Sequence, residues 1–146
     1  LGCAFAVVPD AALRRRFVAA ARGIVPHVNT LGLVATEAAY RDCEDWRRAL
    51  LGVLRRNRDC AEAAIAGIPG LTVSHVEATY LAWIDATGLG VADPAAFFEA
   101  AGVGLSDGAD FALPGWVRLN FGCPLATLEA ALERMRVACH ALFDRR

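Results

Sequence analysis

The sequence predicts a mixed fold, in which an α/β part is followed by a long helix and a small α+β domain. Three patterns in its 146 residues support this prediction. A continuously apolar run over residues 3–8, followed by a helix pattern, is typical of an α/β layer. Apolar residues at helical spacing over residues 43–66 predict one long helix. After residue 70, short alternating runs and helices predict a mostly antiparallel sheet with helices on one side.

The α/β part covers residues 1–42. The run over residues 3–8 contains no polar side chain, as expected for a parallel strand buried on both faces. A helix then begins, with Asp10 as its N-cap, and Gly23 ends it. A second, Ala-rich helix is expected over residues 31–40. Because a buried strand without neighbours leaves its backbone and apolar side chains exposed, we expect this part to be adhesive or oligomeric in isolation.

The long helix at residues 43–66 is predicted to bridge two domains. Gly67 and the pair Pro69-Gly70 end it. Its apolar stripe recurs every three or four residues and consists of Trp46, Leu50, Val53, Leu54, Asn57, Cys60, Ala61, Ala64 and Ile65.

The small domain is expected to cover residues 67–146. Asp93 followed by Pro94 marks the start of a helix, since Asp is a good N-cap and Pro suits the first helical position. The predicted elements in order are strands at 71–74 and 79–85, a helix from 94 to about 101, a Gly-rich loop at 102–115, a strand at 116–121, and a final helix from Pro124.

Composition and charge exclude several functions. The chain has 15 basic and 16 acidic residues and a net charge of −1, whereas nucleic-acid-binding domains concentrate positive charge. No run of about 18 apolar residues appears, so no membrane span is expected. The five cysteines form no CxxC pair and lack zinc-site spacing with the three histidines, so we expect reduced, buried thiols in a cytosolic protein and no metal site.

The strand at 116–121 contains the most informative polar residue. Its alternation places Val117, Leu119 and Phe121 on one face, and Arg118 and Asn120 on the other. An arginine within an apolar strand needs an anionic partner, because burying its charge alone is costly. That partner is either a substrate carboxylate, which suits the planar guanidinium, or an Asp or Glu of the protein. Spacing alone favours the structural ion pair.

Two other segments have alternative interpretations. Asn29 or Thr30 either caps the following helix or lies near an active site. The stretch Gly102–Gly108 could cradle a phosphate, but it follows a helix and lacks a lysine, so a connecting loop is favoured. Ser106 and Asp107 could still line a cleft.

Four segments in order resemble the fold-type I pyridoxal-phosphate enzymes, in particular the cystathionine β-lyase or C–S lyase type. Class I/II aminotransferases are the near neighbours of this type. The segments are Gly2–Asp10, Val28–Tyr40, Glu77–Asp85, and Val103–Phe111 followed by Trp116–Pro124. The resemblance covers essentially the whole chain as a C-terminal half. It implies that residues 1–42 are the end of the large cofactor-binding domain, 43–66 the bridging helix, and 67–146 the small C-terminal domain.

The resemblance also implies a function. Such an enzyme is a cytosolic homodimer that holds pyridoxal 5′-phosphate as a Schiff base with a lysine, and the cofactor acts as an electron sink. A lyase of this type removes the α-proton of a cysteine conjugate such as cystathionine and expels the thiol, leaving pyruvate and ammonia. Arg118 matches the position that binds the α-carboxylate, which reverses the preference for a structural ion pair. Asn29, Thr30 and Asn120 are implied as possible lining of the active site or the subunit interface.

One departure from the family matters for activity. All 15 basic residues are arginines, and the family's lysine would lie just before Leu1. We therefore expect no catalytic residue in these 146 residues, no covalently held cofactor, and no turnover by this chain alone. Two alternatives remain: part of a class I/II aminotransferase, or a non-catalytic module for interaction or dimerisation.

Overall fold

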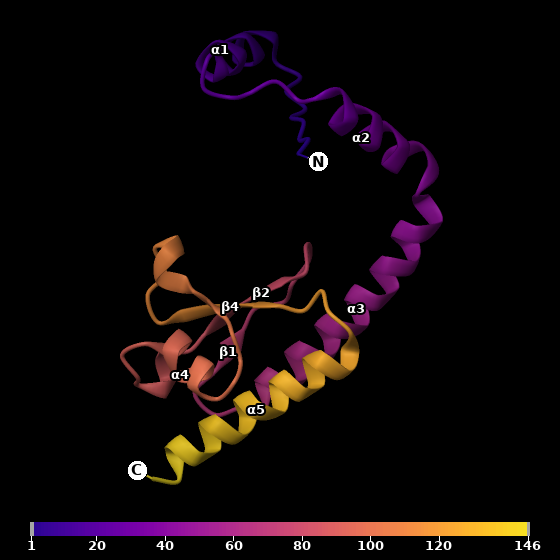
Figure 1. The fold of residues 1–146 in the computed structure, drawn as a ribbon. Helices are drawn as coiled ribbons and strands as arrows, with labels where there is room; N and C mark the ends of the chain where they lie inside the picture. The colour runs from indigo at the N-terminus through magenta and orange to yellow at the C-terminus, as the bar shows by residue number, and fades with distance from the viewer. Residues whose placement is uncertain (1, 146) are drawn as a thin grey trace. The chain divides into compact units, whose positions relative to one another are not determined.

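The computed structural model describes residues 2–145 (Figure 1). Leu1, where the predicted first domain begins, lies outside the described residues. The chain divides between Ala49 and Leu50 into two compact units, each of which is described by itself.

The first unit contains helices α1 (Ala11–Ala21) and α2 (Thr30–Asp42) and the start of α3 (Glu44–Ala66). The predicted N-cap of α1 is confirmed, because Asp10 accepts a hydrogen bond from the backbone N–H of Leu13 at 2.6 Å. Gly23 follows the helix with a φ of 79°, a left-handed conformation that favours glycine. Local capping chemistry thus sets the ends of α1 as the sequence predicts.

The prediction of a strand over residues 3–8 is wrong, because this segment has no regular secondary structure in the structure. A parallel strand needs hydrogen bonds from neighbouring strands, and residues 2–49 contain no other strand. The side chain of Val7 is 80% exposed, and Phe5 is exposed as well, with an edge-to-face ring contact to Tyr40 at 5.6 Å. Leu13 and Phe17 of α1 are also exposed, so this unit presents the apolar surface that the sequence predicts.

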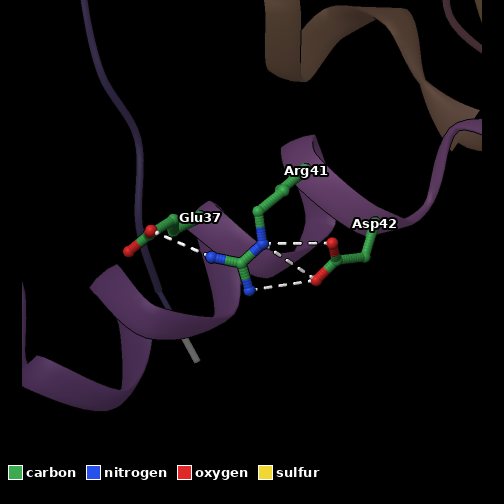
Figure 2. Close-up of polar contacts among 3 residues, drawn as sticks. All are labelled: Glu37, Arg41 and Asp42. Carbon is green, nitrogen blue, oxygen red and sulfur yellow. Dashed lines mark hydrogen bonds and ion pairs between the residues drawn. The ribbon is translucent and has the colours of Figure 1, made fainter.

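An ion-pair cluster lies at the end of α2 (Figure 2). The guanidinium of Arg41 lies 3.1 Å from a carboxylate oxygen of Glu37 and 3.0 Å from one of Asp42. All three side chains are exposed, so solvent screens these pairs and each contributes little to stability. The cluster is therefore a solvated charged surface.

The second unit is built on a four-stranded antiparallel sheet with the order β1-β2-β4-β3. The strands are β1 (Thr72–Val73), β2 (Leu81–Asp85), β3 (Ser106–Asp107) and β4 (Trp116–Asn120). The helices are the rest of α3, α4 (Pro94–Ala100), α5 (Leu125–Phe143), and the short 3₁₀ turns η1 (Thr87–Leu89) and η2 (Gly108–Phe111). The predicted cap of α4 is confirmed, since Asp93 accepts from the N–H of Ala96 at 2.9 Å.

The core of the second unit lies between one face of the sheet and the helices α3 and α5 (Figure 1). Alternate residues of β2 and β4 point into it, and α3 and α5 supply apolar side chains from the other side. These buried residues are Ala82, Ile84, Val117 and Leu119 from the strands, and Ala61, Ile65, Leu128, Leu132 and Met135 from the helices. The predicted one-sided packing is confirmed, and the opposite face of the sheet stays free of these helices.

The Gly-rich loop predicted at residues 102–115 is only partly correct, because it contains β3 and η2. Asp107 caps η2 by accepting from the backbone N–H of Ala109 at 2.9 Å. The two residues of β3 form a strand because they pair with Arg118 and Val117 of β4. A strand this short has no periodicity of its own, so only the pairing reveals it.

The turn between β3 and β4 depends on the absence of a side chain at Gly108. A Cβ there would overlap the carbonyl oxygen of Leu113 and lie 2.6 Å from that of Trp116. We therefore expect Gly108→Ala to lower the free energy of unfolding by about 1–3 kcal/mol, as overpacking does. Gly104→Ala is the matched control, because a Cβ there has nothing within 4 Å. Urea unfolding of both variants is the measurement, and equal stabilities would contradict the prediction.

Candidate functional site

Arg118 lies in the middle of β4 on the face of the sheet opposite the core helices. Its neighbours Val117 and Leu119 are buried, as predicted from the alternation, whereas Arg118 is half-buried. Arg118 pairs in register with Trp83 of β2 and with Ser106 of β3. Side chains of directly paired residues lie on the same face of an antiparallel sheet. The register therefore brings Trp83, Arg118 and Ser106 side by side on this face.

Two contacts hold the guanidinium of Arg118. Its Nη2 donates a hydrogen bond to the hydroxyl oxygen of Ser106 at 3.0 Å. Its Cζ lies 4.6 Å from the centroid of the Phe111 ring, within the range of a cation–π interaction. Phe111 in turn meets Trp83 edge to face, with ring centroids 5.2 Å apart and an interplanar angle of 80°. We call Trp83, Ser106, Phe111 and Arg118 the Arg118 cluster.

The charge of Arg118 has no acidic partner among residues 2–145. The ion pairs found in this part of the chain involve other residues. A guanidinium has five N–H donors, and one of them is used by Ser106. The remaining donors and the positive charge suit a planar carboxylate or a similar anion. The structural ion pair that spacing favoured is thus not formed in the described residues.

The other predicted site residues have local roles in the structure. Asn29 caps α2, since its Oδ1 accepts from the backbone N–H of Gly32 at 2.7 Å, and Thr30 is the first residue of that helix. Asn120 is exposed at the end of β4, where its Oδ1 accepts from the N–H of Gly122 at 2.9 Å. Lining of an active site by these three residues stays a prediction.

Asn57 is a buried polar residue within the apolar stripe of α3. Its side-chain amide donates to the backbone carbonyls of Phe121 at 2.9 Å and Cys123 at 2.8 Å. These carbonyls lie between β4 and α5, so Asn57 ties α3 to the segment that leaves the Arg118 strand. A polar residue within an apolar stripe is a signal for such a bond, because a buried amide needs partners.

The thiols and carboxylates of the described chain do not assemble a metal site. No group of three His, Cys, Asp or Glu side chains suitable for a metal ion occurs within residues 2–145. The five cysteines are free. Cys139 is buried in the core, and this burial raises its pKa to about 11, which keeps the thiol protonated and unreactive. In the same residues, none of the helices combines the length and hydropathy needed to cross a membrane.

The carboxylate of Glu62 on α3 forms hydrogen bonds with the loop that precedes β2. Glu62 accepts from the backbone N–H of Val76 at 2.8 Å and lies 3.0 Å from Nδ1 of His75. Partial desolvation raises the pKa of Glu62, but these hydrogen bonds outweigh that effect and hold the pKa below its usual value. The group thus has a structural role away from the Arg118 cluster.

Comparisons with known proteins show that this chain is similar to parts of cystathionine β-lyases and of pyridoxal-phosphate-bound enzymes. It is 30% identical over 139 residues to the cystathionine β-lyase PatB of Bacillus subtilis, covering 90% of this chain and 36% of that protein. The crystal structure of OvoB is similar with a TM-score of 0.84 and 49% identity, over 91% of this chain and 35% of that one. A pyridoxal-phosphate-bound putative aminotransferase of Clostridium difficile 630 is similar with a TM-score of 0.76 and 34% identity, over 91% and 36% of the two chains.

No protein-family model matches the chain. The chain spans about a third of the length of the curated relatives first matched.

Proposed function

We propose that this chain binds the α-carboxylate of the substrate in a pyridoxal-phosphate-dependent C–S lyase. The chain belongs with the cystathionine β-lyases and C–S lyases, as a C-terminal part of them. The complete enzyme would act on a cysteine conjugate such as cystathionine. With water, the products would be the thiol, pyruvate and ammonia.

The observation that carries this proposal is the unpaired charge of Arg118. The guanidinium is half-buried and touches a hydroxyl and an aromatic ring, with no acidic partner in residues 2–145. An amino-acid substrate brings a carboxylate that supplies the missing charge. Binding it at Arg118 would orient the α-carbon relative to the rest of the active site.

The residues present do not fit covalent attachment of the cofactor. Pyridoxal phosphate supplies an electron sink when it is bound through a lysine amine, and the basic residues of this chain are all arginines. We propose that the cofactor is held elsewhere in the complete enzyme and that this chain contributes substrate binding. The 146 residues alone are then expected to be inactive.

The assembly and location of the enzyme are part of the same proposal. We propose a homodimer, in which Asn29, Thr30 and Asn120 line the active site or the subunit interface. The domains would be residues 1–42, the bridging helix 43–66, and the small domain 67–146. Five free cysteines are compatible with the reducing cytoplasm, where we place the enzyme.

A class I/II aminotransferase is the second candidate. The similarity to the Clostridium difficile structure favours it, because that protein is described as a putative aminotransferase. An aminotransferase also binds the α-carboxylate of its substrate, so Arg118 does not separate the two. The products do, because a transaminase needs a keto-acid acceptor and does not release ammonia.

Assays of two forms of the protein test the proposed function. An antibody against this segment isolates the polypeptide made in the source cells, and the 146-residue chain is expressed separately. Both receive pyridoxal phosphate and L-cystathionine, and pyruvate is measured. We expect pyruvate from the native polypeptide and none from the 146 residues.

Each other outcome has a distinct meaning. Pyruvate formed by the 146 residues would contradict the predicted inactivity. Amino transfer to a keto acid by the native polypeptide, without pyruvate, would favour the aminotransferase. A native polypeptide that catalyses neither reaction would point to a non-catalytic module.

A further inference from the structure

We propose that Ser106 and Phe111 are positioning residues that fix the orientation of the Arg118 guanidinium, and that Ser106 determines which of its edges receives the carboxylate. This inference rests on the proposed function of Arg118 as the carboxylate-binding residue. Ser106 and Phe111 contact the guanidinium directly, and Trp83 supports the ring of Phe111.

The guanidinium of Arg118 has two edges that can each bind a carboxylate. A carboxylate binds in a bidentate manner either to Nε and Nη2 or to Nη1 and Nη2, so each Nη2 hydrogen belongs to one edge. In the structure one hydrogen of Nη2 is donated to the hydroxyl oxygen of Ser106 at 3.0 Å. This bond occupies one edge and leaves the other complete. Ser106 thereby selects a single bidentate geometry.

An aromatic ring fixes the plane of the guanidinium. Phe111 covers one of its faces, with Cζ 4.6 Å from the ring centroid. Phe111 is itself backed by Trp83 in an edge-to-face contact at 5.2 Å. The Ser106 hydrogen bond at the edge of the guanidinium and the Phe111 ring on its face together restrict the rotation of the Arg118 side chain. An arginine side chain otherwise loses rotamer entropy when it binds, so fixing it beforehand strengthens carboxylate binding.

The backbone places Ser106 and Phe111 beside Arg118. Ser106 lies directly opposite Arg118 in the β3–β4 pairing. Phe111 lies at the end of η2, whose first residue, Gly108, packs against the backbone of Leu113 and Trp116. The two contacts with Arg118 therefore come from one short segment, residues 106–111, in which Gly108 packs closely against neighbouring backbone.

The test compares two ligands in the native polypeptide loaded with pyridoxal phosphate. L-Alanine carries an α-carboxylate, and ethylamine is the matched amine without one. Dissociation constants for both are measured from the absorbance of the cofactor. In Ser106→Ala and Phe111→Leu we expect L-alanine to bind about three- to tenfold more weakly, and ethylamine to bind as in the wild type.

Conservative and distant variants serve as controls. Ser106→Thr keeps the hydroxyl and Phe111→Tyr keeps the ring, so both are expected to retain wild-type affinity for L-alanine. Ser74→Ala removes an exposed serine hydroxyl on the loop after β1 and is expected to change neither dissociation constant. Thermal unfolding of every variant shows whether a loss of affinity comes from misfolding, which would weaken the binding of both ligands.

The outcomes separate this inference from the proposed function. Weaker binding of L-alanine alone, restored in the Thr and Tyr variants, supports it. If Arg118→Lys abolishes the preference for L-alanine while Ser106→Ala and Phe111→Leu keep it, the positioning role is overturned and the function of Arg118 stands. If Arg118→Lys keeps the preference, the proposed function of Arg118 itself fails. Equal weakening of the binding of both ligands in Ser106→Ala and Phe111→Leu, with thermal unfolding as in the wild type, would also overturn the positioning role.

Discussion

Replacing Arg118 with lysine in the native polypeptide is expected to lower kcat/KM for L-cystathionine by about a hundredfold or more. Lysine keeps the positive charge but loses the planar pair of donors that binds a carboxylate at two points. Removing one partner of a hydrogen-bonded charge pair costs about 2–5 kcal/mol, and about 3 kcal/mol corresponds to a hundredfold. Most of the change should appear in KM if the carboxylate is bound equally well before and during the reaction.

Arg134→Lys is the matched control for this variant. Arg134 is an exposed arginine of α5, and its Nη1 donates to the backbone carbonyl of Gly102 at 3.1 Å. It lies outside the Arg118 cluster, so its replacement is expected to leave kcat/KM within a factor of about two. Steady-state pyruvate formation is the measurement. An Arg118→Lys enzyme with wild-type kinetics would show that the substrate carboxylate binds elsewhere.

Replacing Asn57 with alanine is expected to lower the free energy of unfolding by about 3 kcal/mol. The side chain is fully buried and donates to two backbone carbonyls, at 2.9 and 2.8 Å. Alanine would leave both carbonyls without this donor and would open a cavity. The wild-type residue already carries a cost, because its Oδ1 is buried without a partner in the described structure. The predicted loss of stability is therefore the benefit of the two hydrogen bonds and of packing, less the cost of burying Oδ1 without a partner.

Asn120→Ala provides the comparison for Asn57→Ala. Asn120 is exposed, and its side chain accepts one local hydrogen bond, from Gly122. Its replacement should cost less than about 1 kcal/mol, since water replaces the lost bond. Urea unfolding followed by far-ultraviolet circular dichroism gives both values. Similar losses for the two variants would mean that burial of the Asn57 amide does not stabilise this fold.

The helices could be predicted from the sequence because their ends are set by local chemistry. Asp10, Asn29 and Asp93 each accept a hydrogen bond from a backbone N–H three residues later. Such a bond needs no distant partner, so a short stretch of sequence contains all the information. The alternation in β4 is local in the same sense, and it correctly separated the buried Val117 from the outward Arg118.

Other features depend on contacts that a pattern does not contain. Residues 3–8 have the composition of a buried strand, but strand formation requires a neighbouring strand. The strand β3 exists only through its pairing with β4. Likewise, the sequence indicates that Ser106 could line a cleft, whereas its hydrogen bond to Arg118 follows from the register of the two strands. Asn57 was placed in the correct stripe, but its carbonyl partners come from another part of the chain.

The hairpin-like pairing of β3 with β4 has a consequence for the order of folding. Ser106 and Arg118 are separated by only 12 residues, and Phe111 lies between them. Closing so short a loop costs little chain entropy, whereas pairing β2 with β4 must close a much longer one. Contacts of low sequence separation form early in folding. We therefore expect the surroundings of Arg118 to begin as a nascent local structure, which Trp83 completes when the distant strand β2 arrives.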